Sequence, residues 1–413
     1  MEKSQRSREF VRNMFAEYYG SLPELSSLTH ISNREFGFVI FDQKGMLRHR
    51  RFRSLDELKH FMAETVPSDA YVSCAQYEEP EAEMNKKGWL GADLIFDIDA
   101  DHIPTSCGKI HDVWTCGGCG FVGKGLTPET CPACGSQKFE VKIWPCETCL
   151  ESAKTETVKL LDILTRDFGF LEKELHLFFS GHRGYHVHVE NEAVRSVDSI
   201  ARKEIVDYVR GLGFDLALHG LGEKAKGLPP IGDKSVTPYG WSARLARAVY
   251  DIVNSASEEN FKGMGLSSDR IAAIVRNKEA ILRSWNGSRR RATAKGVGVE
   301  TWKKLAECCV KSRSACIDTV VTTDIHRLIR LPDSLHGKTG LRKVEFKPSD
   351  INEFDPFKNA VVFKEGKTLV SVSDSPRFRL GDRTYGPYRN QTVELPNAAA
   401  VFLVSKGTAG VIE

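Results

Sequence analysis

The chain carries little net charge, has no long apolar run and contains no low-complexity segment. Its formal net charge is +3, so overall charge does not attract a polyanion and any contact with nucleic acid must be local. Two basic clusters are present, at 48–53 and at 289–291 with Lys295, although either alone is typical of a solvated face. No segment approaches the ~20 apolar residues that span a bilayer, which predicts a protein without a membrane partner.

Residues 1–6 are polar and show no secretory signal, so we expect a cytoplasmic protein. The length of 413 residues allows about two or three structural units, and the hydrophobic and charged fractions of 41% and 27% are ordinary for a globular protein. In a reducing compartment, eleven cysteines favour metal ligation over disulfides.

Apolar periodicity predicts a mixed α/β fold in which one core carries inserted units. Helical patterns cover 8–20, 150–168 and most of 198–316, the last with a loop around 227–230. Strands are expected at 36–41, 71–75, 94–99, 175–179, 185–189 and 319–322, before a β-rich region over 360–404. The chain is thereby divided into core segments 1–101, 151–197 and 317–413, a Cys-rich unit over 102–150 and a helical insertion over 198–316.

The most informative feature is the pair Asp97 and Asp99, at the end of the apolar run 94–99. In a strand, residues i and i+2 point to the same face, so the two carboxylates project together. They repel each other unless a cation lies between them, and such oxygen ligands suit Mg²⁺ or Mn²⁺. An isolated Asp-x-Asp is more often only a strand that runs into a polar turn. A third carboxylate would strengthen the metal site, and the residues alone leave Asp318 and Asp324 as rivals.

Seven of the eleven cysteines lie between residues 107 and 149. Four of them have the spacing of two zinc knuckles: Cys116, Cys119, Cys131 and Cys134. A second set has the number and type of ligands for another tetrahedral site: Cys107, His111, Cys146 and Cys149. The spacing leaves open whether the first knuckle combines with the second or with Cys107 and His111. Closed four-ligand sites are normally structural, so we predict two structural Zn²⁺ ions.

The remaining cysteines lack knuckle spacing and are expected to be core thiols: Cys74, Cys308, Cys309 and Cys316.

A turn at 180–184 concentrates hydrogen-bond donors before the strand expected at 185–189. Gly181 and Gly184 allow a sharp bend and the close approach of a ligand, and Arg183 offers a planar fork that matches phosphate oxygens. His186 shares a strand face with His188. Two histidines at this spacing could bind a metal, but beside an arginine an anion site is the better interpretation.

A second cluster, over 318–341, also suits phosphate through Arg330, His336 and Lys338. The Gly-Lys-Thr sequence at 337–339 invites a P-loop interpretation. We reject it because the glycine required five residues earlier is replaced by Pro332.

Together these residues resemble the catalytic small subunit of the archaeo-eukaryotic primases, of the archaeal type. The resemblance covers nearly the whole chain, through 88–93, Asp97 and Asp99, 146–154, 180–186, Asp318 and 330–340. The chain departs from some relatives at His182, where they have arginine. It also carries the ribbon at 116–134, which looks like an insertion in a shorter zinc module.

The resemblance implies a primase-type catalytic core with an inserted zinc-binding module and a helical insertion. It implies a DNA primase catalytic subunit that acts by two-metal nucleotidyl transfer with pyrophosphate release, and it selects Asp318 over Asp324 as the partner of Asp97 and Asp99. The residues that match the family's nucleotide contacts are Ser180, Arg183, His186, Arg330, His336 and Lys338. The implied catalytic cofactors are two Mg²⁺ or Mn²⁺ ions, in addition to the two structural Zn²⁺ ions that the cysteine spacing predicts. The implied partners are a primase large subunit, a single-stranded DNA template, nucleoside triphosphates and the replication machinery.

Three other functions fit parts of the pattern. A repair or end-joining polymerase of the same superfamily would share the acidic triad and the phosphate loops, but a primase alone makes dinucleotides on an unprimed template. A non-enzymatic zinc-ribbon protein would still bind nucleic acid after the loss of Asp97 and Asp99, and it would not incorporate nucleotides. A metal-dependent nuclease also fits paired carboxylates, yet it would not need two loops suited to a triphosphate.

Overall fold

The computed structural model describes residues 2–22, 25, 28–215, 239–255, 261, 264–287 and 296–412. The chain folds into two compact units, the first from residues 1–157, 172–202 and 317–413 and the second from 158–171 and 203–316. The loop expected around 227–230 and the basic cluster at 289–291 with Lys295 lie outside the described residues. The five-segment division of the sequence stays a prediction.

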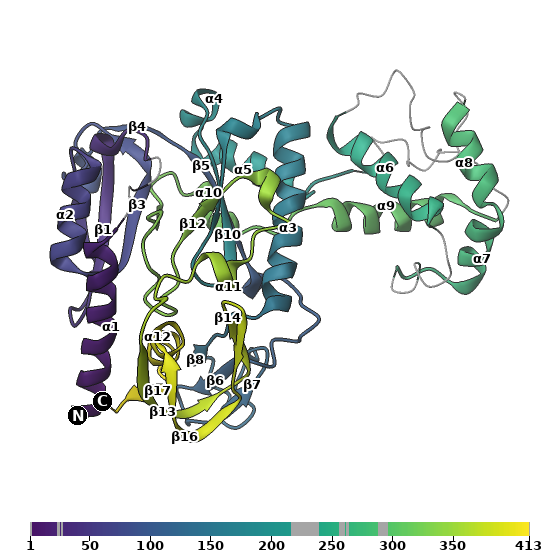
Figure 1. Cartoon of the computed structure of the whole chain (residues 1–413). Coiled ribbons are helices and arrows are strands. Elements are labelled where there is room, and N and C mark those ends of the chain that lie inside the picture. Colours follow the sequence, from purple (N-terminus) through teal and green to yellow (C-terminus); the bar gives the residue numbers. More distant parts are fainter. Residues whose placement is uncertain are drawn as a thin grey trace. The chain divides into compact units, whose positions relative to one another are not determined.

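An antiparallel sheet near the N-terminus holds one hydrophobic core of the first unit. Its strands are β1 (Arg34–Ile40), β2 (Leu47–Arg50), β3 (Pro67–Tyr77), β4 (Trp89–Ala92) and β11 (Leu328–Arg330). They pair in the order β11-β3-β1-β2, with β4 also on β3. Helices α1 (Glu2–Gly20) and α2 (Leu55–Thr65) lie against this sheet (Figure 1). Apolar side chains from both helices and the strands share one core, among them Phe15, Phe36, Phe38 and Met62.

A second antiparallel sheet carries Asp97 and Asp99. Its strands are β5 (Leu94–Asp99), β9 (Leu175–Phe179), β10 (Gly184–Val189) and β12 (Val344–Phe346), in the order β12-β9-β10-β5. Every residue of β10 is buried, including His186 and His188, although the strand alternates these histidines with apolar side chains. Gly184 pairs with Asp99, and His186 pairs with Asp97. This register places the 180–184 turn at the carboxylate end of β5.

Three smaller sheets and several helices complete the first unit. The Cys-rich sheet contains β6 (Val113–Cys116), β7 (Val122–Lys124) and β8 (Phe139–Lys142). The C-terminal sheets contain β13 (Lys367–Ser375), β16 (Tyr388–Pro396) and β17 (Ala409–Val411), and the pair β14 (Phe378–Leu380) and β15 (Arg383–Tyr385). The helices are α4 (Glu192–Arg195), α10 (Thr319–Thr323), α11 (Pro356–Asn359) and α12 (Asn397–Ser405).

The described elements of the second unit are helical. They are α6 (Gly240–Asn254), α7 (Ser268–Arg276), α8 (Lys278–Gly287) and α9 (Val299–Arg313), together with parts of α3 (Glu147–Arg166) and α5 (Ser199–Val209). Apolar stripes on α6, α7 and α9 form a separate core that includes Val249, Ile274, Trp302 and Leu305. Trp302 and Leu305 lie one helical turn apart, as an amphipathic helix requires.

Most of the helices and strands expected from the sequence are present, but one predicted strand is wrong. The strands expected at 36–41, 71–75, 175–179 and 185–189 are β1, β3, β9 and β10, and the helices expected at 8–20 and 150–168 are α1 and α3. The β-branched residues at 319–322 form helix α10 and not a strand. The Asp318 side chain caps this helix by accepting a hydrogen bond from the Val320 amide at 2.9 Å.

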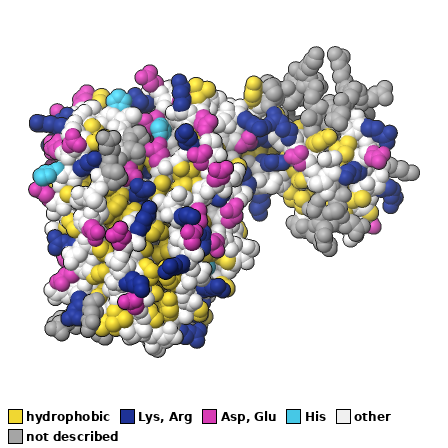
Figure 2. All heavy atoms as spheres, in the orientation of Figure 1, with side chains coloured by type: hydrophobic (Ala, Val, Ile, Leu, Met, Phe, Trp, Pro, Cys, Tyr) yellow, Lys and Arg dark blue, Asp and Glu magenta, His cyan; other side chains and the backbone are white. Residues whose placement is uncertain are grey.

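The charge distribution on the surface agrees with the expectation from the sequence, and the burial of the isolated cysteines agrees with it in part. Figure 2 shows basic and acidic side chains interspersed over the visible face, in agreement with the small net charge. Cys74 and Cys309 are buried thiols as expected, whereas Cys308 and Cys316 are only partly buried. Among the helices that the structure describes, none is both long and apolar enough to cross a membrane.

Candidate active site

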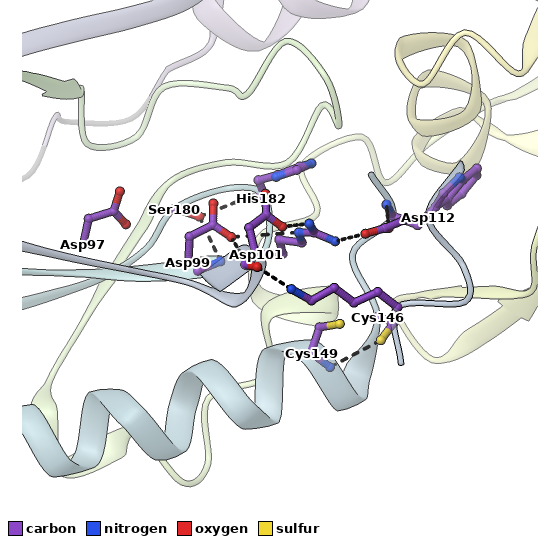
Figure 3. Close-up of polar contacts among 12 residues, drawn as sticks. Asp97, Asp99, Asp101, Asp112, Cys146, Cys149, Ser180 and His182 are labelled. Atoms are coloured by element: carbon purple, nitrogen blue, oxygen red, sulfur yellow. Dashed lines mark hydrogen bonds and ion pairs between the residues drawn. The ribbon is translucent and has the colours of Figure 1, made fainter. Parts of the chain in front are cut away.

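Asp97 and Asp99 project from the same face of β5, near its C-terminal end (Figure 3). Their side chains are 23% and 35% exposed, respectively. The neighbouring Phe96 and Ile98 are fully buried. The strand alternation therefore directs both partly buried carboxylates to the face opposite Phe96 and Ile98, and these apolar side chains anchor the strand.

Asp318 adjoins this pair. Its backbone amide donates a hydrogen bond to the carbonyl oxygen of Asp97 at 2.8 Å. Burial, followed by the negative charges of Asp99 and Asp318, raises the pKa of Asp97 to about 7. A divalent cation relieves this kind of repulsion, and a set of carboxylate oxygens has the ligand chemistry of a Mg²⁺ or Mn²⁺ site. Asp318 and its rival Asp324 each accept a local main-chain hydrogen bond, at 2.9 Å from the Val320 and His326 amides, respectively. Asp318 is the one of the two whose charge acts on Asp97.

Ser180 and two glycines shape the turn before β10. The Ser180 hydroxyl accepts hydrogen bonds from the amides of His182 at 3.3 Å and Gly184 at 3.2 Å. Gly181 has a φ of +84°, a left-handed conformation that glycine adopts without steric cost. At Gly184 a Cβ atom would lie 2.4 Å from the carbonyl oxygen of Ile98, so a glycine is needed where β10 meets β5.

The Arg183 guanidinium lies among carboxylates. Its side chain is 2% exposed, and it forms ion pairs with Asp101 and with Asp112, the latter at 2.8 Å. Its Nε atom is 3.9 Å from Asp99 Oδ1. Because acidic groups engage the guanidinium here, the contact of Arg183 with a phosphate stays a prediction.

The loop at 330–341 meets the 180–184 turn. The Thr339 hydroxyl donates a hydrogen bond to the Gly181 carbonyl at 2.6 Å. The ring of His336 stacks on that of His182, with centroids 4.9 Å apart. Two segments that the sequence identified separately as suited to phosphate are therefore neighbours in space.

Arg330 anchors this loop from the first sheet. Its guanidinium donates hydrogen bonds to Asp69 Oδ1 at 2.8 Å and to the Leu335 carbonyl at 3.1 Å. The Gly337 amide donates to the same Asp69 oxygen at 3.1 Å. Asp69 therefore holds both the arginine and the loop backbone.

Two lysines add positive charge beside the stacked histidines. Nζ of Lys406, which follows α12, is 3.0 Å from Nε2 of His182. Burial, with the charges of Arg183 and Lys338, lowers the pKa of Lys406 to about 7. Burial also holds the pKa values of His182 and His336 well below their usual range. The negative charge of Asp112 opposes the shift at Lys406, so this lysine has an acidic neighbour. The basic groups around His182 and His336 still give this corner the character of an anion site.

His186 lies beside Asp97. Its Nε2 atom is 3.5 Å from Asp97 Oδ1, and its ring stacks on that of His188 at a centroid distance of 6.3 Å. Burial, with the charge of Lys343, holds the pKa of His186 well below its usual range. A neutral imidazole next to Asp97 can form a hydrogen bond without adding charge to the site.

The eight cysteine and histidine ligands form two groups, and within each group the ligand atoms lie within 4.8 Å of one another. The first group is Cys107, His111, Cys146 and Cys149, and the second is Cys116, Cys119, Cys131 and Cys134. The alternative pairing of Cys107 and His111 with the first knuckle is therefore wrong. The sets have the number and type of ligands that tetrahedral zinc requires. In the first set, hydrogen bonds from Cys149 and His111 lower the pKa of Cys146 to about 4, which favours the metal-binding thiolate.

The sequence reasoning missed several residues around the site: Asp69, Asp101, Asp112, Lys343 and Lys406. Asp101 alone had a usable signal, since it continues the alternation of Asp97 and Asp99. The others come from distant segments, and only the fold brings them to the site.

Known proteins are similar to this chain over nearly its whole length. The sequence model of a family described as DNA primase small subunit matches residues 144–348. A protein named DNA primase small subunit PriS from Methanothrix thermoacetophila is 35% identical over 98% of this chain and 99% of its own length. Proteins of the same name from Nitrosopumilus maritimus and Archaeoglobus fulgidus are 31% and 34% identical, each over 97% of this chain and over 98% and 97% of their own lengths.

Proposed function

This chain belongs to the DNA primase small subunit family, and from that premise we propose that it makes short primers on single-stranded DNA at the cluster of Asp97, Asp99 and Asp318. The observation that supports this site is the convergence of three carboxylates with two loops that carry cations and imidazoles. Nucleotidyl transfer needs both features, since carboxylates bind the metal ions and cationic groups bind the triphosphate.

Asp97, Asp99 and Asp318 would hold two Mg²⁺ or Mn²⁺ ions, which when bound activate a 3′-hydroxyl and stabilise the departing pyrophosphate. The protein itself positions the three carboxylates. Strand β5 keeps two carboxylates on one face, and the main-chain hydrogen bond between Asp318 and Asp97 keeps the third beside them. Catalysis then depends mainly on alignment and electrostatic stabilisation.

The triphosphate would lie against the two loops. The residues proposed to contact it are Ser180, Arg183, His186, Arg330, His336 and Lys338. Lys406 adds a further donor from the end of α12. Arg183 and Arg330 are held by carboxylates, so their guanidinium groups have defined orientations before a nucleotide binds.

We also propose two structural Zn²⁺ ions in the two ligand groups, a primase large subunit as partner and a cytoplasmic role with the replication machinery. Initiation must order a template and two nucleotides before a primer exists. That ordering costs translational and rotational entropy, and a second subunit that helps to hold the template and nucleotides would reduce the cost.

The proposal is tested by primer synthesis on unprimed single-stranded DNA with labelled nucleotides, with Mg²⁺ or Mn²⁺ added. We expect Asp97→Asn, Asp99→Asn and Asp318→Asn each to lower the rate by at least about a hundredfold and to leave template binding intact. The matched control is Asp324→Asn, which keeps an oxygen for the His326 amide and should retain activity.

Wild-type activity in Asp318→Asn with loss of activity in Asp324→Asn would reverse the assignment of the third carboxylate. Synthesis only from a supplied primer would favour a repair polymerase. Template binding without any nucleotide incorporation would favour a zinc-ribbon adaptor.

A further inference from the structure

The carboxylate of Asp112 joins the first cysteine and histidine group to the proposed active site. Its Oδ1 atom is 2.8 Å from Nδ1 of His111 and accepts a hydrogen bond from the Trp144 amide at 2.9 Å. Its Oδ2 atom accepts a hydrogen bond from the Arg183 guanidinium at 2.8 Å. The side chain of Asp112 is only 5% exposed, so water cannot readily replace these partners.

The other nitrogen of His111 faces the thiols. Its Nε2 atom is 3.5 Å from Cys107 Sγ and 3.4 Å from Cys149 Sγ. A histidine that binds metal through Nε2 donates Nδ1–H to a second group, and a carboxylate in that position fixes the ring and its tautomer. Asp112 is placed to serve His111 in this way.

On its other side, Arg183 is shared among acidic groups. It pairs with Asp101 as well as Asp112, and its Nε atom lies 3.9 Å from Asp99 Oδ1. Figure 3 labels these three aspartates. A second link joins the same two segments, since the Lys109 ammonium donates a hydrogen bond to the Asp101 carbonyl. The loop at 107–112 is therefore tied to the turn that follows β5.

We propose that Asp112 is a positioning residue that couples metal binding at Cys107, His111, Cys146 and Cys149 to the orientation of Arg183. With metal bound, His111 holds Asp112, and Asp112 holds Arg183 toward Asp101. If Asp112 is lost or displaced, Arg183 keeps Asp101 as a partner but can turn toward Asp99, whose Oδ1 atom lies 3.9 Å from its Nε atom. It then competes with divalent cations for that carboxylate and leaves its place in the 180–184 turn. This role rests on the proposed function.

The test compares Asp112→Asn with wild-type full-length protein. The asparagine keeps the shape of the side chain but cannot hold Arg183 as an ion pair. We expect zinc affinity, measured by competition with a chromophoric chelator, to fall about 10- to 100-fold. Binding of a fluorescent nucleoside triphosphate in the presence of Mn²⁺ should weaken at least about fivefold. Saturating zinc should restore the metal content of the variant but not its nucleotide affinity.

The matched control is Asp355→Asn. Asp355 also accepts hydrogen bonds from one arginine, Arg379, through both oxygens at 2.8 and 2.9 Å. Among the described residues, its side-chain hydrogen bonds go to Arg379 and the Phe357 amide and to no cysteine or histidine of the two groups. This variant should keep wild-type zinc and nucleotide affinities. His111→Gln, which removes the metal ligand and leaves Asp112 in place, should weaken triphosphate binding as Asp112→Asn does, and the double variant should be no worse than either.

Equal triphosphate affinity in folded Asp112→Asn and wild-type protein would overturn the coupling. If the variants fail to fold, the test uses wild-type protein. Stepwise removal of its zinc by the chelator should weaken triphosphate binding, and added zinc should restore that binding. Unchanged affinity in zinc-depleted wild-type protein would also overturn the coupling. A wild-type protein that binds no triphosphate at all would instead contradict the proposed function.

Discussion

The backbone amide of Asp318 donates a hydrogen bond of 2.8 Å to the carbonyl oxygen of Asp97. Main-chain atoms make this link, so it holds α10 beside β5 whatever the two side chains are. Substitution of either aspartate by asparagine should therefore remove charge and preserve the arrangement. This property makes isosteric variants informative about electrostatics at the carboxylate cluster.

The first prediction concerns Asp97 and the pH dependence of stability. Its pKa is about 7 in the folded protein and about 3.9 in an unfolded chain. Between these values the folded state holds a proton that the unfolded state has lost, so the free energy of unfolding falls as pH rises from about 4 to about 7. Without added divalent ions, Asp97→Asn should be roughly 2–4 kcal/mol more stable than wild type at pH 8 and similar to it at pH 4.

Urea unfolding at the two pH values measures this difference. Addition of Mn²⁺ at pH 8 should stabilise the wild-type protein more than the variant, since ligands stabilise the state that binds them. A stability difference that is the same at both pH values would contradict the elevated pKa.

The second prediction concerns Gly184, which faces the Ile98 carbonyl at the end of β5. A Cβ atom at Gly184 would approach that oxygen to 2.4 Å, so Gly184→Ala must push β10 away from β5 and shift the 180–184 turn. We expect a loss of about 1–3 kcal/mol in unfolding free energy and a clear drop in primer synthesis. Gly20→Ala is the control, because nothing lies within 4 Å of its Cβ position. Equal effects of the two substitutions would refute the steric argument.

The third prediction concerns Lys406. If its ammonium contacts the triphosphate, Lys406→Ala should raise the KM for nucleotides about 10- to 100-fold, as expected for a lost charge-assisted hydrogen bond, with a smaller change in kcat. Lys367→Ala is a suitable control, since Lys367 is exposed and pairs only with Glu394 among the described residues. Steady-state kinetics with varied nucleotide concentration provides the measurement. An unchanged KM in Lys406→Ala would exclude the contact.

The fourth prediction concerns the two ligand groups. Elemental analysis of purified protein should find about two zinc ions per chain, one for each tetrahedral group. Cys131→Ser should lose the ion of the second group and keep that of the first, because the two groups share no ligand. Simultaneous loss of both ions would indicate that the groups do not bind metal independently.

Local spacing in the sequence determined several features of this protein. The i, i+2 positions of Asp97 and Asp99 placed both carboxylates on one strand face, and the residue patterns at 175–179 and 185–189 predicted the strands that are present there. The CxxC spacings required paired thiols. These features depend on backbone geometry over a few residues. Local spacing was misleading at 319–322, where the cap from Asp318 outweighed the β-branched side chains.

Apart from the choice of Asp318, which the family resemblance already indicated, only the tertiary structure decided how the local pieces combine. It grouped the ligand pairs, brought Asp318 to Asp97, and placed Lys406 beside His182 and Asp112 between His111 and Arg183. These contacts join segments that are far apart in the chain. They depend on strand pairing and packing between distant elements, which no short window of sequence contains.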